Sequence, residues 1–267
     1  AYEILPGLVG SEMCIRDRAS SIGTCNTMGT ASTMGAVLEA LGLALTGTTG
    51  IPAVDARKRS SSQLAGRRIV ELIKEDVTFS KIATKEAFEN AIRVNAAIGG
   101  GTNTTVHLLA IAGRLGIPLT IDDIEANSKD IPLLANIMPN GDYLGQDLFY
   151  AGGLPALMNS LLSRLNQNAI TVSGLTIKES VQDAEIFDNR VITTLDKPFK
   201  TDPGLAVLKG NLAPRGAIIK PTAASPQLLQ HRGPAVVFES IEELDERIDS
   251  SDLNVSADSV LVLKNIG

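Results

Sequence analysis

The sequence contains no tryptophan, six phenylalanines and three tyrosines, so it lacks the aromatic platforms on which proteins stack nucleic-acid bases. Its longest basic run is Arg57–Arg59 and its net charge is −6, which argues against a nucleic-acid partner. No apolar run reaches the roughly 18 residues of a membrane helix, and the N-terminus lacks the pattern of a signal peptide, so no membrane partner is expected. Two cysteines, Cys14 and Cys25, are too few for a disulfide framework and indicate a reducing cytoplasm.

The composition that remains is typical of a globular protein. The 267 residues are 44% hydrophobic and 20% charged, which suits one large domain or two ordinary ones. Residues 1–18 stand apart, because Ser11–Arg18 resembles translated sequencing-adapter read-through and position 1 is not methionine. We expect residues 1–18 to be non-native, expect the natural protein to begin further upstream, and set this segment aside together with Cys14.

Apolar residues at helical spacing predict a series of helices through the first two thirds of the chain. The expected helices are one following Gly23–Met34, then 61–74, 84–97, 106–115, 120–127, and a pair separated by Gly152-Gly153 that ends near Leu165. Thr84 is a plausible N-cap, and Gly116 followed by Pro118 is a common helix stop. These features predict a helical α/β domain over residues 19–168.

Short β-rich segments dominate the remainder of the chain. The expected strands are 169–172, 191–194, 205–208, 216–219, 235–238 and 260–263, with one acidic helix at 241–248 between the last two. Such a series of short strands is typical of a sandwich or a barrel. We therefore expect a β-rich domain over residues 169–267 that is truncated, since the chain stops directly after a strand.

Cys25 is the first candidate functional residue. It lies in a turn of small and hydroxylated residues just before a predicted helix, where backbone N–H groups and the helix dipole favour a thiolate. Position alone favours a buried structural cysteine. A second loop, Gly99–Asn103, can present N–H groups to an anion, although a glycine triplet alone favours an ordinary loop with an N-cap. His107, among apolar residues, is expected to be a core residue.

Five motifs in order resemble one known family, the dihydroxy-acid and sugar-acid dehydratases, which includes the 6-phosphogluconate dehydratases. These motifs are Gly23–Met34, Ala87–Ala91, Gly99–Asn103 with His107-Leu108, Gly210–Ala217 and Gly233–Glu239. The resemblance covers about Ser20 to Gly267. It implies an α/β fold in which a helix-rich N-terminal domain precedes a barrel-like, swivelling C-terminal domain.

The resemblance also implies a hydro-lyase that converts a 2,3-dihydroxy acid into a 2-keto acid. An iron–sulfur cluster, 2Fe–2S or 4Fe–4S, would act as Lewis acid on the leaving 3-hydroxyl. A magnesium ion would hold the carboxylate and 2-hydroxyl, and a serine alkoxide would take the C2 proton. The family forms homodimers or homotetramers.

On this match Cys25 stands at the position of one cluster ligand, which reverses the expectation from its position alone. Asn26 and the glycine-rich loop, with Gly100, Thr102 and Asn103, are expected to line the substrate. The other cluster cysteines and the magnesium ligands belong mostly upstream, and the catalytic serine belongs beyond Gly267. Gly101 also replaces a serine that is usual in this loop. The chain is therefore interpreted as an internal fragment that is inactive alone.

The residues after Cys25 refine the substrate class. Asn26-Thr27-Met28 and Lys220–Pro226 resemble the pentonate and hexonate dehydratases, so the expected substrate is an aldonic acid such as a pentonate, giving a 2-keto-3-deoxy acid. Three alternatives remain. They are a dihydroxy-acid dehydratase of branched-chain amino-acid biosynthesis, a non-catalytic binding or assembly protein of the same fold, and a thiol enzyme using Cys25 and His107 as nucleophile and base.

Overall fold

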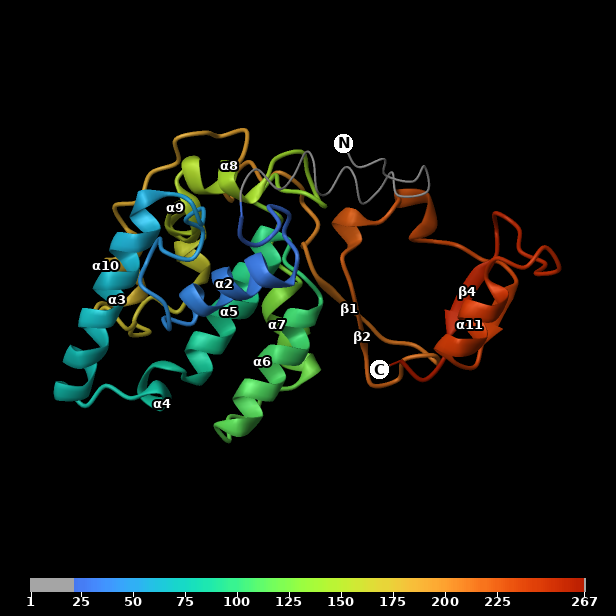
Figure 1. Cartoon of the computed structure of the whole chain (residues 1–267), viewed down its shortest axis with the longest axis horizontal. Helices are drawn as coiled ribbons and strands as arrows, with labels where there is room; N and C mark the ends of the chain where they lie inside the picture. Colours follow the sequence, from blue (N-terminus) through green and yellow to red (C-terminus); the bar gives the residue numbers. More distant parts are fainter. Residues whose placement is uncertain (1–21, 267) are drawn as a thin grey trace. The chain divides into compact units, whose positions relative to one another are not determined.

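The structure is a computed structural model that describes residues 22–266 (Figure 1). The chain divides into two compact units, with the boundary between Ala223 and Ala224. The elements of the first unit are α2 (Thr30–Ala40), α3 (Ala56–Lys74), α4 (Phe79–Ile82), α5 (Lys85–Ile98), α6 (Asn103–Arg114), α7 (Ile121–Ser128), α8 (Gly145–Tyr150), α9 (Gly153–Ser160), η2 (Leu162–Arg164), α10 (Ile177–Val181), β1 (Ala206–Leu208), β2 (Ala217–Ile219) and η3 (Pro221–Ala223). Those of the second unit are η4 (Pro226–Leu228), β3 (Ala235–Phe238), α11 (Ile241–Arg247) and β4 (Val260–Leu263).

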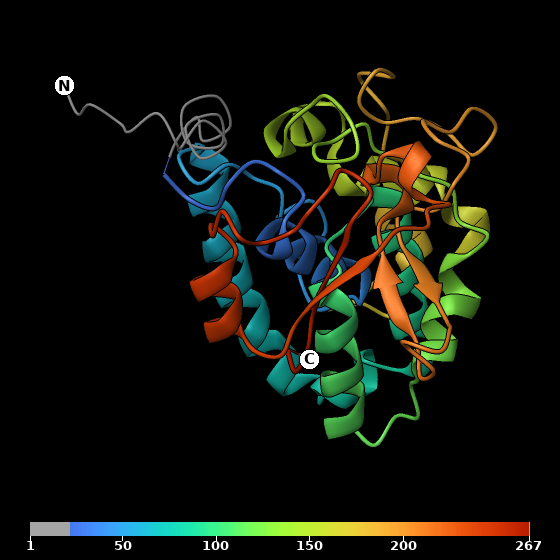
Figure 2. The same ribbon diagram turned by 90° about the vertical axis from the view of Figure 1, so that its right-hand side faces the viewer.

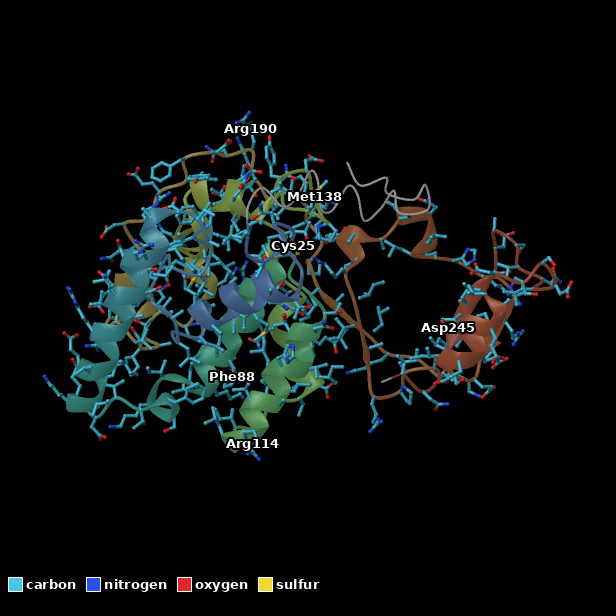
Figure 3. All side chains as sticks on the ribbon, in the orientation of Figure 1. Cys25, Phe88, Arg114, Met138, Arg190 and Asp245 are labelled. Carbon is cyan, nitrogen blue, oxygen red and sulfur yellow. The ribbon has the colours of Figure 1, made fainter. Side chains whose placement is uncertain are left out.

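Helix α5 runs through the interior of the first unit and packs against α2 and α7 (Figures 1 and 2). It starts where predicted, because the Thr84 side chain accepts a hydrogen bond from the Ala87 N–H and Glu86 occupies the first turn. Ten of its fourteen residues are buried, including Phe88 (labelled in Figure 3) and Ile98. This buried helix determines where the glycine-rich loop that follows it lies.

Most of the predicted helices are present, with some shifted boundaries. Helix α7 begins at the predicted place with a capping box, in which Thr120 and Asp123 exchange side-chain and backbone hydrogen bonds. Helix α3 begins at Ala56 rather than at Ser61, because the Asp55 side chain accepts from the Arg57 N–H and caps the helix earlier. The short helices α4 and α10 were not predicted, since one turn gives too little periodicity to detect.

The predicted strands are only partly confirmed. β1 pairs with β2 in antiparallel register and β3 pairs with β4 in parallel register, and each pair is a separate two-stranded sheet. The segments 169–172 and 191–194 do not form strands: within them Ile170, Ile192 and Thr194 make only isolated bridges. Within residues 22–266 the architecture is a helix-rich α/β mixture, and these sheets do not close into a barrel. The barrel-like C-terminal domain stays a prediction.

Residues 169–223 pack with the helical part of the chain. Val191, Ile192 and Val181 belong to the same buried cluster as Val94 and Ile98 of α5. The compact unit that contains these residues ends at Ala223. Residues 1–18, expected to be non-native, lie outside the described residues. In the part of the chain that the structure describes, no helix combines the length and apolarity needed to cross a bilayer.

Candidate functional site around Cys25

Cys25 lies in the loop that leads into α2, as the sequence predicts (Figure 3). Its thiol is free and exposed, so the alternative of a buried structural cysteine is wrong. The Cys25 Sγ lies 3.4 Å from the Thr27 Oγ1, and the Ser32 hydroxyl donates to the Cys25 carbonyl at 3.3 Å. These two contacts hold the cysteine beside the first turn of an eleven-residue helix.

The glycine-rich loop begins where α5 ends. Gly99 caps α5 in the left-handed conformation, with φ 62°, which glycine adopts at little cost. A Cβ atom on Gly100 would lie 1.9 Å from the Asn95 Oδ1, so only glycine fits there. The chain then turns at once into α6, with Thr102 at its N-cap and exposed to solvent.

Two hydrogen bonds join this loop to the first turn of α2. The Gly101 N–H donates to the Thr33 Oγ1 at 2.9 Å, and the Asn103 Nδ2 donates to the Thr30 Oγ1 at 2.9 Å. The N-termini of α2 and α6 therefore lie side by side, and neither has a side-chain cap. Two adjacent helix N-termini make this surface favourable for negative charge. Sequence reasoning missed Thr30 and Thr33, because only the fold brings them to residues about 70 positions later.

Asn26 occupies a different part of the site. Its carbonyl accepts a hydrogen bond from the Gly145 N–H at 2.6 Å. Asn26 also lines a cavity of about 290 Å³, together with residues from the start of α3 and from α8, among them Lys58, Gln146 and Phe149. The glycine-loop residues do not line this cavity. The expected substrate-lining residues are thus divided between the two helix N-termini and the neighbouring cavity.

The buried side-chain amide of Asn140 holds the start of the glycine-rich loop in place. The Asn140 Nδ2 donates to the Gly99 carbonyl at 2.8 Å, and the Thr222 hydroxyl donates to the Asn140 Oδ1 at 2.9 Å. The Lys200 Nζ in turn donates to the Thr222 carbonyl at 2.7 Å. The run Pro139-Asn140-Gly141-Asp142 predicts a turn from the sequence alone. It gives no sign of this role of Asn140, because the hydrogen-bond partners are distant in the chain.

Two titratable side chains near these elements have altered pKa values. Burial raises the pKa of the Glu39 carboxyl in α2, although it accepts hydrogen bonds from Gly47 and Thr49. Burial lowers the pKa of the Lys220 ammonium, which directly follows β2, to about 8. Neither was singled out as a titrating group, because burial cannot be read from a single residue type.

The donor set for a metal centre is incomplete among residues 22–266. No group of three or more His, Cys, Asp or Glu side chains gathers there. Cys25 offers one thiol, whereas iron–sulfur clusters are held by several cysteine thiolates. Cys14 falls outside the described residues. Cys25 fits the part of a single ligand, and a complete centre needs donors from elsewhere.

The thiol-enzyme alternative receives no support from the geometry. His107 is exposed on α6, so the expectation of a core histidine is wrong. Among the described residues no hydrogen bond joins it to Cys25, whose thiol contacts Thr27 instead. A nucleophile and its base need such contact.

Comparison with known proteins connects the described site to a family. The profile described as dihydroxy-acid/6-phosphogluconate dehydratase N-terminal matches residues 11–180, and the corresponding C-terminal profile matches residues 190–267. The N-terminal match thus begins within the segment 1–18 that the sequence analysis set aside.

Individual curated proteins are similar over most of this chain. A putative dehydratase IlvD1 of Rhizobium meliloti is 52% identical over 92% of the chain, and an L-arabinonate dehydratase of Rhizobium leguminosarum is 51% identical over 92%. A dihydroxy-acid dehydratase of Caldicellulosiruptor bescii is 46% identical over 85%. The chain spans only 43%, 43% and 41% of these three relatives. The two profiles together match most of its length, and the chain belongs to the dihydroxy-acid/6-phosphogluconate dehydratase family.

Proposed function

We propose that the whole protein containing this chain is a hydro-lyase that dehydrates a sugar acid or a related dihydroxy acid. The observation that carries this proposal is the position of Cys25, exposed at the paired N-termini of α2 and α6, in a chain of the dehydratase family. The names of the relatives are consistent with it, since they include dehydratases of both substrate classes. The chain covers less than half of each of these relatives, so the activity is assigned to the longer protein.

Within this class we propose an aldonic acid as substrate, such as a pentonate, with a 2-keto-3-deoxy acid as product. Two relatives at 51% and 50% identity are named L-arabinonate and L-arabonate dehydratase. Asn26-Thr27-Met28, which resembles the same branch, lies next to Cys25 in the cavity-lining loop. The second candidate is a dihydroxy-acid dehydratase, which relatives at 46% identity support.

Cys25 would supply one thiolate to an iron–sulfur cluster in the longer protein. When bound, the cluster and a magnesium ion would supply Lewis-acid chemistry at the leaving hydroxyl and the enolate. The remaining cluster cysteines, the magnesium ligands and the serine base are proposed to lie outside this chain. The swivelling barrel-like domain, the division into domains over 19–168 and 169–267, and assembly into a homodimer or homotetramer belong to the same proposal.

The chain's own residues would bind and orient the acid. The N-termini of α2 and α6 present backbone N–H groups where an anion is favoured. Thr102 and Asn103 begin the second of these helices, and the hydrogen bond from Asn103 to Thr30 keeps the two ends together. Gly100 leaves room for the close approach of α2, since a methyl group there would lie 2.6 Å from the Thr33 Cγ2 of that helix.

The test is to express the complete gene, reconstitute the protein anaerobically with iron, sulfide and magnesium, and assay keto-acid formation. L-Arabinonate, D-xylonate, 6-phosphogluconate and 2,3-dihydroxyisovalerate are compared at equal concentration. We expect the pentonates to give a kcat/KM at least ten times that of the other acids. A preference for 2,3-dihydroxyisovalerate would favour the second candidate, and no turnover of any acid by cluster-loaded protein would favour the non-catalytic alternative.

Two variants distinguish a cluster-ligand role of Cys25 from a role as nucleophile. Cys25→Ser should lower both bound iron and turnover by more than tenfold, because a serine hydroxyl is a poor replacement for a thiolate ligand. His107→Ala is the matched control, since His107 is exposed and makes no contact with Cys25. Loss of turnover in both variants with iron retained would instead support the thiol mechanism.

A further inference from the structure

Glu39 lies on α2 and carries a buried charge. Among residues 22–266 it is the one acidic or basic residue that is buried, with 3% of its surface exposed. Burying a carboxylate is costly unless hydrogen-bond donors surround it. The Glu39 Oε1 accepts from the Gly47 N–H at 2.5 Å, and its Oε2 accepts from the Thr49 N–H at 3.2 Å and the Thr49 hydroxyl at 2.6 Å. Both carboxylate oxygens are therefore used on one short loop.

This loop connects α2 with α3. Residues 43–53, the α2–α3 loop, contain no helix or strand, so their backbone N–H groups need other partners. One carboxylate satisfies two of these N–H groups and a hydroxyl at the same time. A glutamine side chain could not, because one of its two ends is a donor. The loop therefore requires an acceptor with two free oxygens at position 39.

The helix face beside Glu39 is shaped for the same loop. Gly35 lies four residues before Glu39, so the two residues share one face of α2. A Cβ atom on Gly35 would lie 3.4 Å from the Thr49 Cβ. From the side of α3, the Lys58 Nζ donates to the Thr48 carbonyl at 3.3 Å. The loop is thus held by both of the helices that it connects.

The held loop forms one wall of the cavity beside Cys25. Thr49, Gly50 and Ile51 line the same 290 Å³ cavity as Asn26. Glu39 does not line this cavity and instead lines a smaller one of about 120 Å³. The carboxylate therefore acts on the wall from behind, without contact with a molecule bound in the larger cavity.

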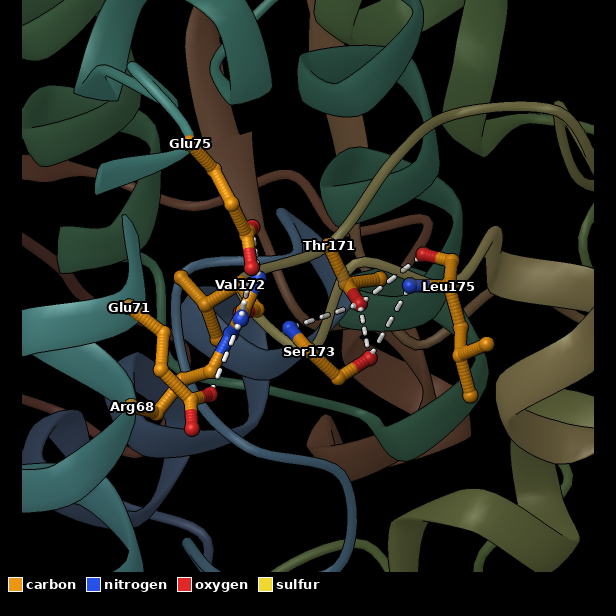
Figure 4. Close-up of polar contacts among 7 residues, drawn as sticks. All are labelled: Arg68, Glu71, Glu75, Thr171, Val172, Ser173 and Leu175. Carbon is orange, nitrogen blue, oxygen red and sulfur yellow. Dashed lines mark hydrogen bonds and ion pairs between the residues drawn. The ribbon is translucent and has the colours of Figure 1, made fainter. Parts of the chain in front are cut away.

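A second attachment between α2 and α3 lies outside this cavity. The Val172 N–H donates to the Gly42 carbonyl, just beyond the end of α2. The Arg68 Nε–H of α3 donates to the Val172 carbonyl, and the Thr171 hydroxyl donates to the Leu175 carbonyl within the same turn (Figure 4). None of these residues lines the cavity. The two attachments use similar hydrogen bonds, but only the first belongs to the cavity wall.

We propose that Glu39 is a positioning residue, whose carboxylate holds the α2–α3 loop in place as one wall of the cavity that receives the acid. This inference rests on the proposed function, which places the acid beside Asn26. The contacts that carry it lie between residues 35 and 58, so no other part of the longer protein is needed to form them. Loosening the wall should weaken binding of the acid and leave the reacting atoms unaffected.

The first test measures amide hydrogen exchange at residues 47–51 in the protein expressed from the complete gene. Glu39→Gln replaces one acceptor oxygen by a donor, and Thr49→Val removes the hydroxyl that donates to Glu39 while keeping the side-chain size. We expect exchange at residues 47–51 to become about tenfold faster in both variants. Thr171→Val is the matched control, because it removes a hydroxyl hydrogen bond from a turn outside the cavity and should leave this exchange unchanged.

The second test separates KM from kcat in the same protein, loaded with its cluster and magnesium and assayed on L-arabinonate. Glu39→Gln and Thr49→Val should raise KM about fivefold with little change in kcat, because the wall contributes to binding and not to the chemical step. Thr171→Val should change neither constant. A merely structural role of Glu39 would lower the Tm of all three variants and leave KM at the wild-type value.

Separate results bear on the loop, the cavity and the proposed function. Unchanged exchange at residues 47–51 in Glu39→Gln would overturn the proposal, because the carboxylate would not hold the loop. Faster exchange with an unchanged KM would overturn it as well, because the loop would not be a wall of the substrate cavity. If the cluster-loaded wild-type protein turns over no acid, the proposed function fails. Faster exchange in Glu39→Gln would then still support the positioning of the loop, and equal exchange would refute it.

Discussion

Helices α3 and α5 belong to the same compact unit but differ in how much of each helix is buried. Ten of the fourteen residues of α5 are buried, whereas α3 buries one of nineteen. The buried helix holds the glycine-rich loop in place, because its last residue leads directly into Gly99 and Gly100. The exposed helix keeps its apolar face free. The comparison teaches that the packing of α5 determines the position of the glycine-rich loop, whereas the exposed second half of α3 can change with little effect on that loop.

The strongest way to break the comparison is to truncate one apolar side chain in each helix. Phe88→Ala should lower the free energy of unfolding by about 3–5 kcal/mol, because Phe88 is fully buried and leaves a cavity. Ile73→Ala should change it by no more than about 0.5 kcal/mol, because Ile73 is exposed. Urea denaturation followed by circular dichroism measures both values. Equal losses would show that α3 is packed as closely as α5.

Replacing one glycine by alanine in the glycine-rich loop and one in α3 should change the free energy of unfolding in opposite directions. Gly100→Ala should destabilise the chain by about 1–3 kcal/mol, since the new methyl group collides with Asn95 and Thr33. Gly66→Ala should stabilise it by up to about 1 kcal/mol, because alanine favours a helix. A neutral Gly100→Ala would mean that the glycine loop moves freely away from α2.

Removing the buried Asn140 amide should lower the free energy of unfolding by a similar or smaller amount than Gly100→Ala. Asn140→Ala leaves the Gly99 carbonyl and the Thr222 hydroxyl without their partner and should cost about 1–3 kcal/mol. Asn140→Asp keeps the acceptor for Thr222 but loses the donor to Gly99. We expect hydrogen exchange at residues 99–101 to become faster in both variants and to remain unchanged in Ile73→Ala.

The smallest effects concern two carboxylates and have opposite signs with pH. The folded chain binds the Glu39 proton more tightly than the unfolded chain. Stability relative to Glu39→Gln should therefore fall as the pH rises from about 4.5 through the raised pKa.

Hydrogen bonding to Arg57 lowers the pKa of Asp55 from 3.8 to about 2. Stability relative to Asp55→Asn should be present above pH 3.8 and disappear as the pH falls through 2. Urea titrations at a series of pH values measure both slopes, and equal signs would contradict this assignment.

The sequence by itself determined the local features of this protein. The cap at Thr84, the capping box at Thr120 and the turn at Pro139–Asp142 depend on neighbouring residues, so they could be predicted without the fold. The placement of Cys25 before a helix N-terminus is of the same kind. The family motifs added the hydro-lyase hypothesis, which local features alone do not contain.

Only the tertiary structure decided which of these features meet. The hydrogen bonds from Asn103 to Thr30 and from Asn140 to Gly99 join residues 73 and 41 positions apart. The segments 169–172 and 191–194 have strand-like composition, yet they form only isolated bridges. A strand also needs a partner strand beside it, and residue type alone does not supply one. Likewise, the apolar spacing of α3 predicts a helix but not its exposure. Exposure depends on which surfaces the rest of the chain covers, and that is a property of long-range packing.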